Sequence, residues 1–120
     1  MLADRLRAAA SRCDAIIATG GVSVGDHDVL KVALEKLGGA TMHSLEIAMR
    51  PGKHVAVASL GQRRIPAFGL PGNPVAALVT YELLVRPALR AMAGCPVLDR
   101  PRLAAIAETD LPRGQGPNSI

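Results

Sequence analysis

Apolar residues recur along this chain with a spacing that changes from helical to strand-like and back. Spacings of three and four residues predict amphipathic helices over 3–12 and 28–37. Short apolar runs and alternating positions predict strands at 15–18, 40–49, 55–60 and 65–70. The longest predicted helix covers 74–93, with Asn73 as its N-cap and Pro74 at its first position. Helices that alternate with strands in this way indicate an α/β fold.

Two prolines and the last twenty residues refine this prediction. Pro66 predicts that its strand lies at a sheet edge or near a bulge, and Pro87 predicts a kink in the long helix. Leu103–Ala107 has the composition of a further strand, but the residues after it carry no core signal. We therefore expect an α/β domain at 1–98 and the incomplete start of a C-terminal β domain at 99–120.

Composition limits the kinds of function that the chain can have. The 120 residues are 49% hydrophobic, yet they include one Tyr, one Phe and no Trp, so the predicted core is aliphatic. Single-stranded nucleic-acid binding needs aromatic stacking platforms, which are missing. The net charge of +4 indicates a mild preference for anionic ligands and not a DNA-binding stripe. No apolar run is long enough to predict a membrane span.

The cysteine pattern and the N-terminus both favour the cytoplasm. Cys13 and Cys95 are isolated, without CxxC spacing, and are expected to be reduced, buried small hydrophobes. The N-terminus lacks the continuous apolar region of a signal peptide.

Two glycine-rich loops carry the strongest functional signal. The first runs over 19–28 and reads TGGVSVGDHD, and the second runs over 69–74 and reads GLPGNP. Each loop follows a predicted strand and precedes a predicted helix, so both loops are expected at one edge of the sheet. Because the loops contain few bulky side chains, their backbone N–H groups can approach a ligand closely, and phosphate-like anions suit such cradles.

Charged and hydroxyl side chains near these loops have two open interpretations each. Asp28 either caps the second helix or binds Mg²⁺, and Ser23 either donates to a phosphate or caps a turn. Arg50 and Lys53 are either anion-binding groups or solvated turn charges. Neither a nucleophile–base arrangement nor zinc-ligand spacing is visible. Catalysis would therefore depend on metal ions and positioned anion donors.

Three segments in order resemble the molybdopterin molybdotransferases, the molybdenum insertases related to the E domain of gephyrin. They read TGGVSVGDHDVLKVALEKLGG, AMRPGK and GLPGNPVAALVTYELLVRPALRAMAG, between Cys13 and Gly94. The resemblance implies a three-layer α/β/α molybdopterin-binding domain with a mostly parallel sheet. Members of this family have an additional strand and helix before the first segment, so the chain is expected to be truncated at both ends.

The resemblance also implies a function in molybdenum-cofactor biosynthesis. Enzymes of this family are transferases that bind adenylylated molybdopterin, insert molybdate and release AMP with a divalent cation, usually Mg²⁺. They are homodimers, and the molybdopterin adenylyltransferase is a further expected partner. The implied catalytic residues are Asp28, which also binds the metal, and Arg50. The implied substrate-binding residues are Thr19, Gly20, Gly21, Ser23, Gly25, Lys53, Pro71, Gly72, Asn73 and Pro74.

Two alternatives remain open. One is a related enzyme of the same fold, a molybdopterin adenylyltransferase or a nucleotide hydrolase, although the continuation Ser23–Val24–Gly25 favours the insertase. The other is a non-catalytic module that binds a pterin or pairs with another subunit. Glu46 supports this second alternative, because many family members have Lys there and an acid repels an oxyanion.

Overall fold

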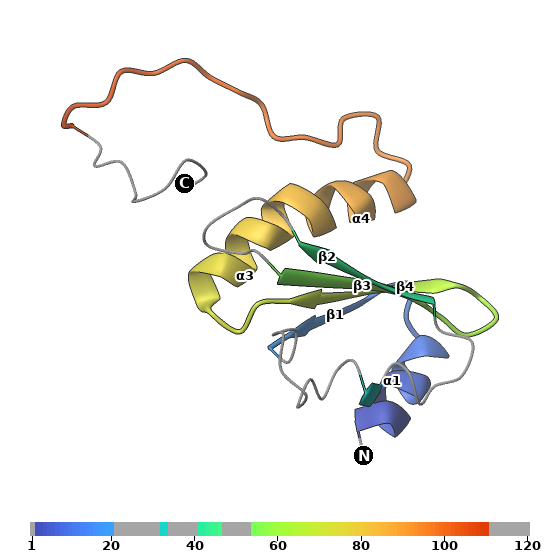
Figure 1. Ribbon diagram of the computed structural model, residues 1–120. Coiled ribbons are helices and arrows are strands. Elements are labelled where there is room, and N and C mark those ends of the chain that lie inside the picture. Colours follow the sequence, from blue (N-terminus) through green and yellow to red (C-terminus); the bar gives the residue numbers. More distant parts are fainter. Residues whose placement is uncertain (1, 21–31, 34–40, 47–53, 111–120) are drawn as a thin grey trace.

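A four-stranded sheet with helices on both faces organises the part of the chain that the computed structural model describes, residues 2–20, 32–33, 41–46 and 54–110 (Figure 1). The elements in chain order are α1 (Leu2–Ala10), β1 (Ile16–Thr19), β2 (Thr41–Glu46), β3 (His54–Leu60), β4 (Ile65–Leu70), α3 (Pro74–Thr80), the π-helical segment η1 (Tyr81–Val85) and α4 (Arg86–Met92). The four predicted strands are thus confirmed, with small shifts of their ends. Most of the predicted helix at 28–37 lies outside the described residues.

The sheet is mixed and not mostly parallel. Its strand order is β1-β4-β3-β2, in which β1 pairs with β4 in parallel while the other two pairs are antiparallel. The prediction of a mostly parallel sheet is therefore wrong for these strands. The physical reason is the short turn over 61–64 between β3 and β4, because a parallel pair needs a crossover of a dozen or more residues.

Pro66 does not mark an edge strand, because β4 lies between β1 and β3. It is the second residue of β4, and the ladder with β1 begins one residue later, at Ala67. The missing N–H of the proline therefore falls outside that ladder, which is how an interior strand tolerates it.

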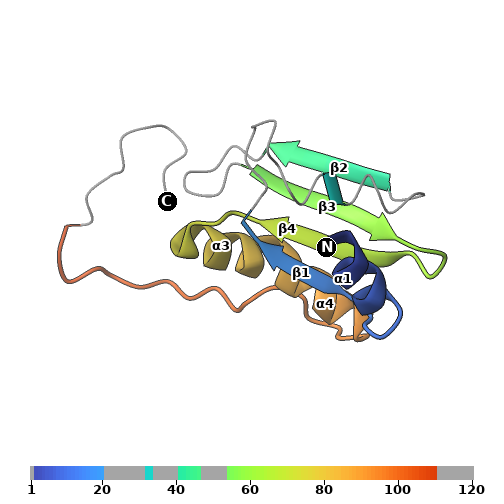
Figure 2. The same ribbon diagram turned by 90° about the horizontal axis from the view of Figure 1, so that it is seen from below.

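The two faces of the sheet carry two separate apolar cores. On one face α1 contributes Leu6, which packs with Ala58, Leu60 and Ala67. On the other face α3, η1 and α4 cover Val55, Phe68 and Leu70, with the fully buried Val85 at the centre (Figures 1 and 2). This arrangement confirms a three-layer α/β/α fold. The core is aliphatic as expected, apart from Phe68.

One continuous helical stretch from Pro74 to Met92 confirms the long predicted helix, although its hydrogen bonding changes along its length. The backbone N–H of Arg86 donates to the carbonyl of Tyr81, five residues back, in the π-helical segment. Pro87 follows directly, and it cannot donate to a carbonyl in the preceding turn. The predicted irregularity near Pro87 thus takes the form of a π segment, a recognised cause of helix distortion.

Two further expectations fail in the described residues. Leu103–Ala107 forms no strand, and its residues are exposed. Cys13 is exposed and Cys95 is half-buried, so they are not the buried hydrophobes expected, although both are free thiols as predicted. Across the described part of the chain, no helix has the length and apolar character that crossing a membrane requires.

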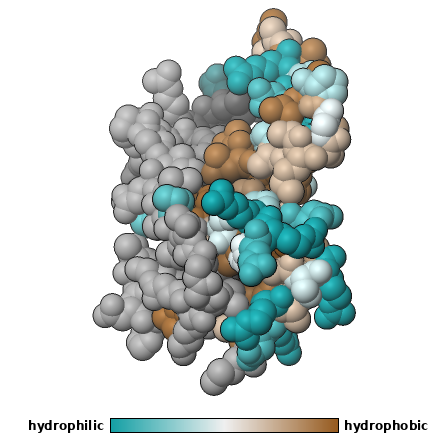
Figure 3. Space-filling model, turned by 90° about the vertical axis from the view of Figure 1, so that its right-hand side faces the viewer, coloured by the Kyte–Doolittle hydropathy of each residue, from teal (hydrophilic) through white to brown (hydrophobic). Residues whose placement is uncertain are grey.

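The β3–β4 turn marks the end of the sheet that lies opposite the glycine loops. Gly61–Arg64 is exposed, and hydrophilic surface extends across the middle of the molecule on that side (Figure 3). Arg63 Nη2 donates to Asp14 Oδ1 at 3.1 Å, which ties the turn to the segment before β1. Arg64 has a φ of 52°, in the left-handed region.

Candidate functional site

The ends of β1 and β4 bring the two glycine loops together. In the parallel ladder Thr19 is the register partner of Leu70, so both strands finish at the same edge of the sheet (Figure 2). The N–H of Gly20 donates to the Leu70 carbonyl at 2.9 Å, which extends the pairing by one residue into the first loop. The predicted meeting of the loops at one edge is confirmed for their described residues.

Two glycines form the contact between the loops. Gly20 has a φ of 83°, a conformation that costs little only for glycine. Gly72 has an ordinary φ, but a Cβ built on it would lie 3.5 Å from the Gly20 Cα. The two loops therefore lie close together, and the absence of a side chain at Gly72 leaves the surface between them open.

The start of α3 is capped by its own residues. Asn73 Oδ1 accepts from the N–H groups of Val75 at 3.0 Å and Ala76 at 3.1 Å. The N–H of Ala77 donates to the Asn73 carbonyl at 2.8 Å, and Pro74 has no N–H. The predicted N-cap and N1 proline are both confirmed.

This capping limits which groups of the second loop can contact an anion. The cap already uses the backbone N–H groups of Val75 and Ala76 in the first turn. The helix dipole still favours an anion at this end. The groups suited to contact it directly are the Thr19 hydroxyl and the amides of Gly72 and Asn73.

Six predicted substrate-binding residues are described, and the structure places all of them at this edge. Thr19, Gly72, Asn73 and Pro74 are exposed, while Gly20 and Pro71 are half-buried. None of these six residues carries a charge. The described part of the site is therefore a small polar surface of backbone, hydroxyl and amide groups.

The other predicted site residues lie outside the described residues: Gly21, Ser23, Gly25, Asp28, Arg50 and Lys53. They include every charged group that was expected at the site. Glu46 ends β2, in register with His54 of β3. Among the described residues no three His, Cys, Asp or Glu side chains gather to hold a metal ion. The metal-binding role of Asp28 therefore stays a prediction.

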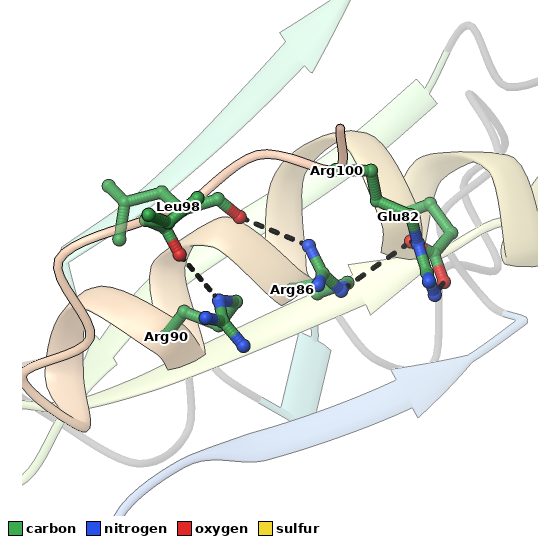
Figure 4. A network of polar contacts seen from close by, with 6 residues as sticks. Glu82, Arg86, Arg90, Leu98 and Arg100 are labelled. Carbon is green, nitrogen blue, oxygen red and sulfur yellow. Dashed lines mark hydrogen bonds and ion pairs between the residues drawn. The ribbon is translucent and has the colours of Figure 1, made fainter. Parts of the chain in front are cut away.

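The strongest charged arrangement in the described chain lies away from the loops and was not predicted. Arg100 Nε and Nη2 donate to the two carboxylate oxygens of Glu82, both at 2.8 Å (Figure 4). This hydrogen bonding lowers the pKa of Glu82 and raises that of Arg100. Glu82 also forms an ion pair at 3.7 Å with Arg86, four residues further along the helix. Arg100 is 18 residues from Glu82, a separation that no local pattern reveals.

Comparisons with known proteins agree with the resemblance. Residues 1–91 match the family described as "probable molybdopterin binding domain". A molybdopterin molybdenumtransferase of Nostoc sp. is 42% identical over 94 residues, which are 78% of this chain and 21% of the relative. A protein of the same name from Haemophilus influenzae is 41% identical over 110 residues, 91% of this chain and 26% of the relative.

A solved structure has the same fold. The crystal structure of the molybdopterin biosynthesis moea protein from Pyrococcus horikosii superposes with a TM-score of 0.61 at 30% sequence identity. The match covers 78% of this chain and 22% of that one. The chain thus spans about a fifth to a quarter of the length of these relatives. With its three-layer fold, its paired glycine loops and a family match over 91 residues, the chain belongs to the molybdopterin-binding domain family.

Proposed function

We propose that this chain is the molybdopterin-binding part of a molybdenum insertase. In that reaction the phosphoanhydride bond of adenylylated molybdopterin breaks, two oxygens of molybdate are exchanged for the two dithiolene sulfurs, and AMP and water leave. The observation that carries the proposal is the contact between the glycine loops at the ends of β1 and β4. The names of the relatives, molybdopterin molybdenumtransferases, support this reaction over others of the same fold.

The described residues have binding roles in this proposal. The Thr19 hydroxyl and the amides of Gly72 and Asn73 donate to phosphate oxygens of the substrate, and the α3 dipole favours the same charge. Gly20 and Gly72 keep side chains out of the space that the substrate occupies, while Pro71 and Pro74 fix the shape of the second loop.

The remaining roles are proposed for residues outside the described part. Gly21, Ser23 and Gly25 continue the first binding loop, and Arg50 and Lys53 attract molybdate or phosphate. Asp28 is the carboxylate proposed to hold Mg²⁺, which would neutralise charge as AMP leaves. A cytoplasmic homodimer that receives its substrate from the molybdopterin adenylyltransferase completes the proposal.

Calorimetric titration with adenylylated molybdopterin, with and without Mg²⁺, followed by measurement of AMP release on adding molybdate, tests this function. Binding followed by molybdate-dependent AMP release is the expected result. AMP release that needs no molybdate would favour a nucleotide hydrolase. Binding without release would reduce the role of the chain to holding the pterin.

A pair of variants tests whether the loops bind the substrate. Asn73→Asp keeps an N-cap oxygen but adds a negative charge where we expect phosphate. Repulsion of at least about 1 kcal/mol at close range predicts affinity about fivefold weaker or worse. Gln62→Glu adds the same charge at the exposed β3–β4 turn, at the other end of the sheet, and should leave affinity unchanged. Equal effects of the two variants would contradict binding at the loops.

A further inference from the structure

The long helix formed by α3, η1 and α4 buries its residues in pairs that repeat every four residues. This helix lies across one face of the sheet (Figure 1). The helix residues that are buried, or that pack in the core around Val85, are Ala76, Ala77, Thr80, Tyr81, Leu84, Val85, Ala88 and Leu89. Two residues separate each pair from the next, on both sides of η1 as well as within it.

A regular α-helix cannot keep a four-residue repeat on one face. At about 3.6 residues per turn, the twelve residues from Ala76 to Ala88 would make about 3.3 turns and leave the two side chains roughly 120° apart around the helix. A span shorter by one residue would make about 3.1 turns, an offset of only about 20°. The helix therefore contains one residue more than a regular α-helix needs to bring both of its halves to the sheet.

The chain absorbs this additional residue in η1. The N–H of Arg86 donates to the carbonyl of Tyr81, five residues back, whereas an α-helix bonds four residues back. Leu83 lies between two of the buried pairs and is 56% exposed, while the other four residues of η1 are buried or half-buried. Leu83 is thus the residue of η1 that a shorter, regular helix could lose.

Two features act on η1, the packing of the helix and Pro87. The proline lacks an N–H, which explains one missing hydrogen bond but does not fix how far the two halves rotate. Packing does fix it, because Thr80 just before η1 and Val85 at its end are both fully buried. Return of η1 to regular α-helical bonding would turn one of these two side chains away from its buried position.

We propose that the packing repeat, and not Pro87, holds η1 as a one-residue adjustment of helix rotation that keeps α3 and α4 on the sheet together. Because α3 begins at Asn73, the same adjustment fixes the end of the second glycine loop beside Gly20. This proposal concerns how the helix holds the loop, and it does not depend on insertase activity.

Substitution of Pro87 separates the two features. Pro87→Ala restores an N–H and removes the ring that disfavours a regular helix. In the isotope-labelled full chain, NMR coupling across the hydrogen bond identifies the carbonyl that accepts from the Arg86 N–H. We expect Tyr81 to remain the acceptor in Pro87→Ala, as in the unchanged chain. A shift of the acceptor to Glu82, four residues back, would overturn the proposal, because it would show that the proline holds η1.

Deletion of Leu83 in the Pro87→Ala background tests the rotation directly. Arg86 then follows Tyr81 by four residues, so their hydrogen bond becomes an ordinary α-helical one and both halves of the helix keep their buried faces. The urea midpoint of this variant should equal or exceed that of its matched control, Leu83→Ala in the same background, which removes the side chain but keeps the length. A clearly lower midpoint, or failure to fold while the control folds, would contradict the proposal.

A second deletion supplies the comparison. Removing Leu78 together with Leu83 leaves about 2.8 turns between Ala76 and Ala88, an offset of roughly 80° in the opposite direction. The urea midpoint should then fall well below that of the length-preserving control, Leu78→Ala with Leu83→Ala, or the chain should not fold. Equal midpoints for the single and the double deletion would also overturn the proposal, because the helix would then tolerate any rotation of its two halves.

Discussion

Gly20 and Gly72 touch each other, but the structure requires glycine at the two positions for different reasons. At position 20 glycine is required by the backbone conformation, because a φ of 83° would bring a Cβ too close to the following carbonyl. Gly72 has no such need, and a Cβ there would make only an ordinary contact. A methyl group at Gly72 therefore tests the open surface between the loops, while one at Gly20 tests the backbone.

We predict that Gly20→Ala lowers the free energy of unfolding by about 1–2 kcal/mol, the cost of the left-handed conformation for a residue with a Cβ. Gly72→Ala should change stability much less but should weaken binding of adenylylated molybdopterin. Chemical denaturation measures the first effect and calorimetric titration the second. Similar losses of stability in both variants would contradict this assignment of roles.

At the residue scale, sequence reasoning succeeded where the cause is local. The N-cap Asn73 and the N1 proline Pro74 follow from the backbone of the helix they start, and both were predicted correctly. The burial of Cys13 depends on what packs against the end of α1, and the sequence alone did not indicate its exposure.

At the scale of elements, the side chains of Glu82, Arg86 and Arg90 join η1 and α4 to the segment that follows them: Arg90 donates to the Val97 carbonyl, Arg86 to the Leu98 carbonyl, and Glu82 pairs with Arg100. The Glu82 carboxylate accepts two hydrogen bonds from Arg100 and lies near Arg86. The guanidinium of Arg100 holds the pKa of Glu82 below its ordinary value. The ionised form of Glu82 is therefore the form that holds Arg100.

The pH dependence of the Glu82–Arg100 pair follows from the direction of this shift. Because the pKa of Glu82 is lower in the folded protein, the stability that the pair contributes is fully present above the unfolded-state pKa and is lost as the pH falls through the folded-state pKa. The chemical shift of the Arg100 Nε–H proton, which donates to Glu82, should follow this change when measured by NMR from neutral to acidic pH, and should move only in the acid range. Glu82→Gln should remove this pH dependence, and a wild-type profile in that variant would contradict the assignment.

The boundaries of elements were predicted better than their pairing. The alternation of apolar and polar residues within β2, β3 and β4 depends on each strand alone, so the ends of these strands were predicted to within a few residues. Parallel or antiparallel direction depends on the connection, and the short turn at 61–64 was the evidence against the parallel sheet that the resemblance implied. Leu103–Ala107 has a strand-like composition but no strand beside it in the described residues, and composition alone does not create a partner.

At the scale of the whole molecule, the sheet separates two apolar cores that share only its strands. Leu60 belongs to the core under α1, and Val85 to the core under the long helix. The two glycine loops leave the sheet from β1 and β4, and β4 contributes to both cores through Ala67 and Phe68. The position of the loops therefore depends on packing on both faces.

The separation of the cores predicts how core mutations combine. Leu60→Ala should cost about 2–5 kcal/mol, and Val85→Ala roughly 2 kcal/mol from the loss of two buried carbons and the cavity left behind. Because the two side chains lie in different clusters on opposite faces, their costs should add to within about 0.5 kcal/mol in the double variant. Urea denaturation of the two single variants and the double variant measures this sum. A large deviation from additivity would mean that the sheet transmits strain between its faces, and the glycine loops at its edge would then respond to changes in either core.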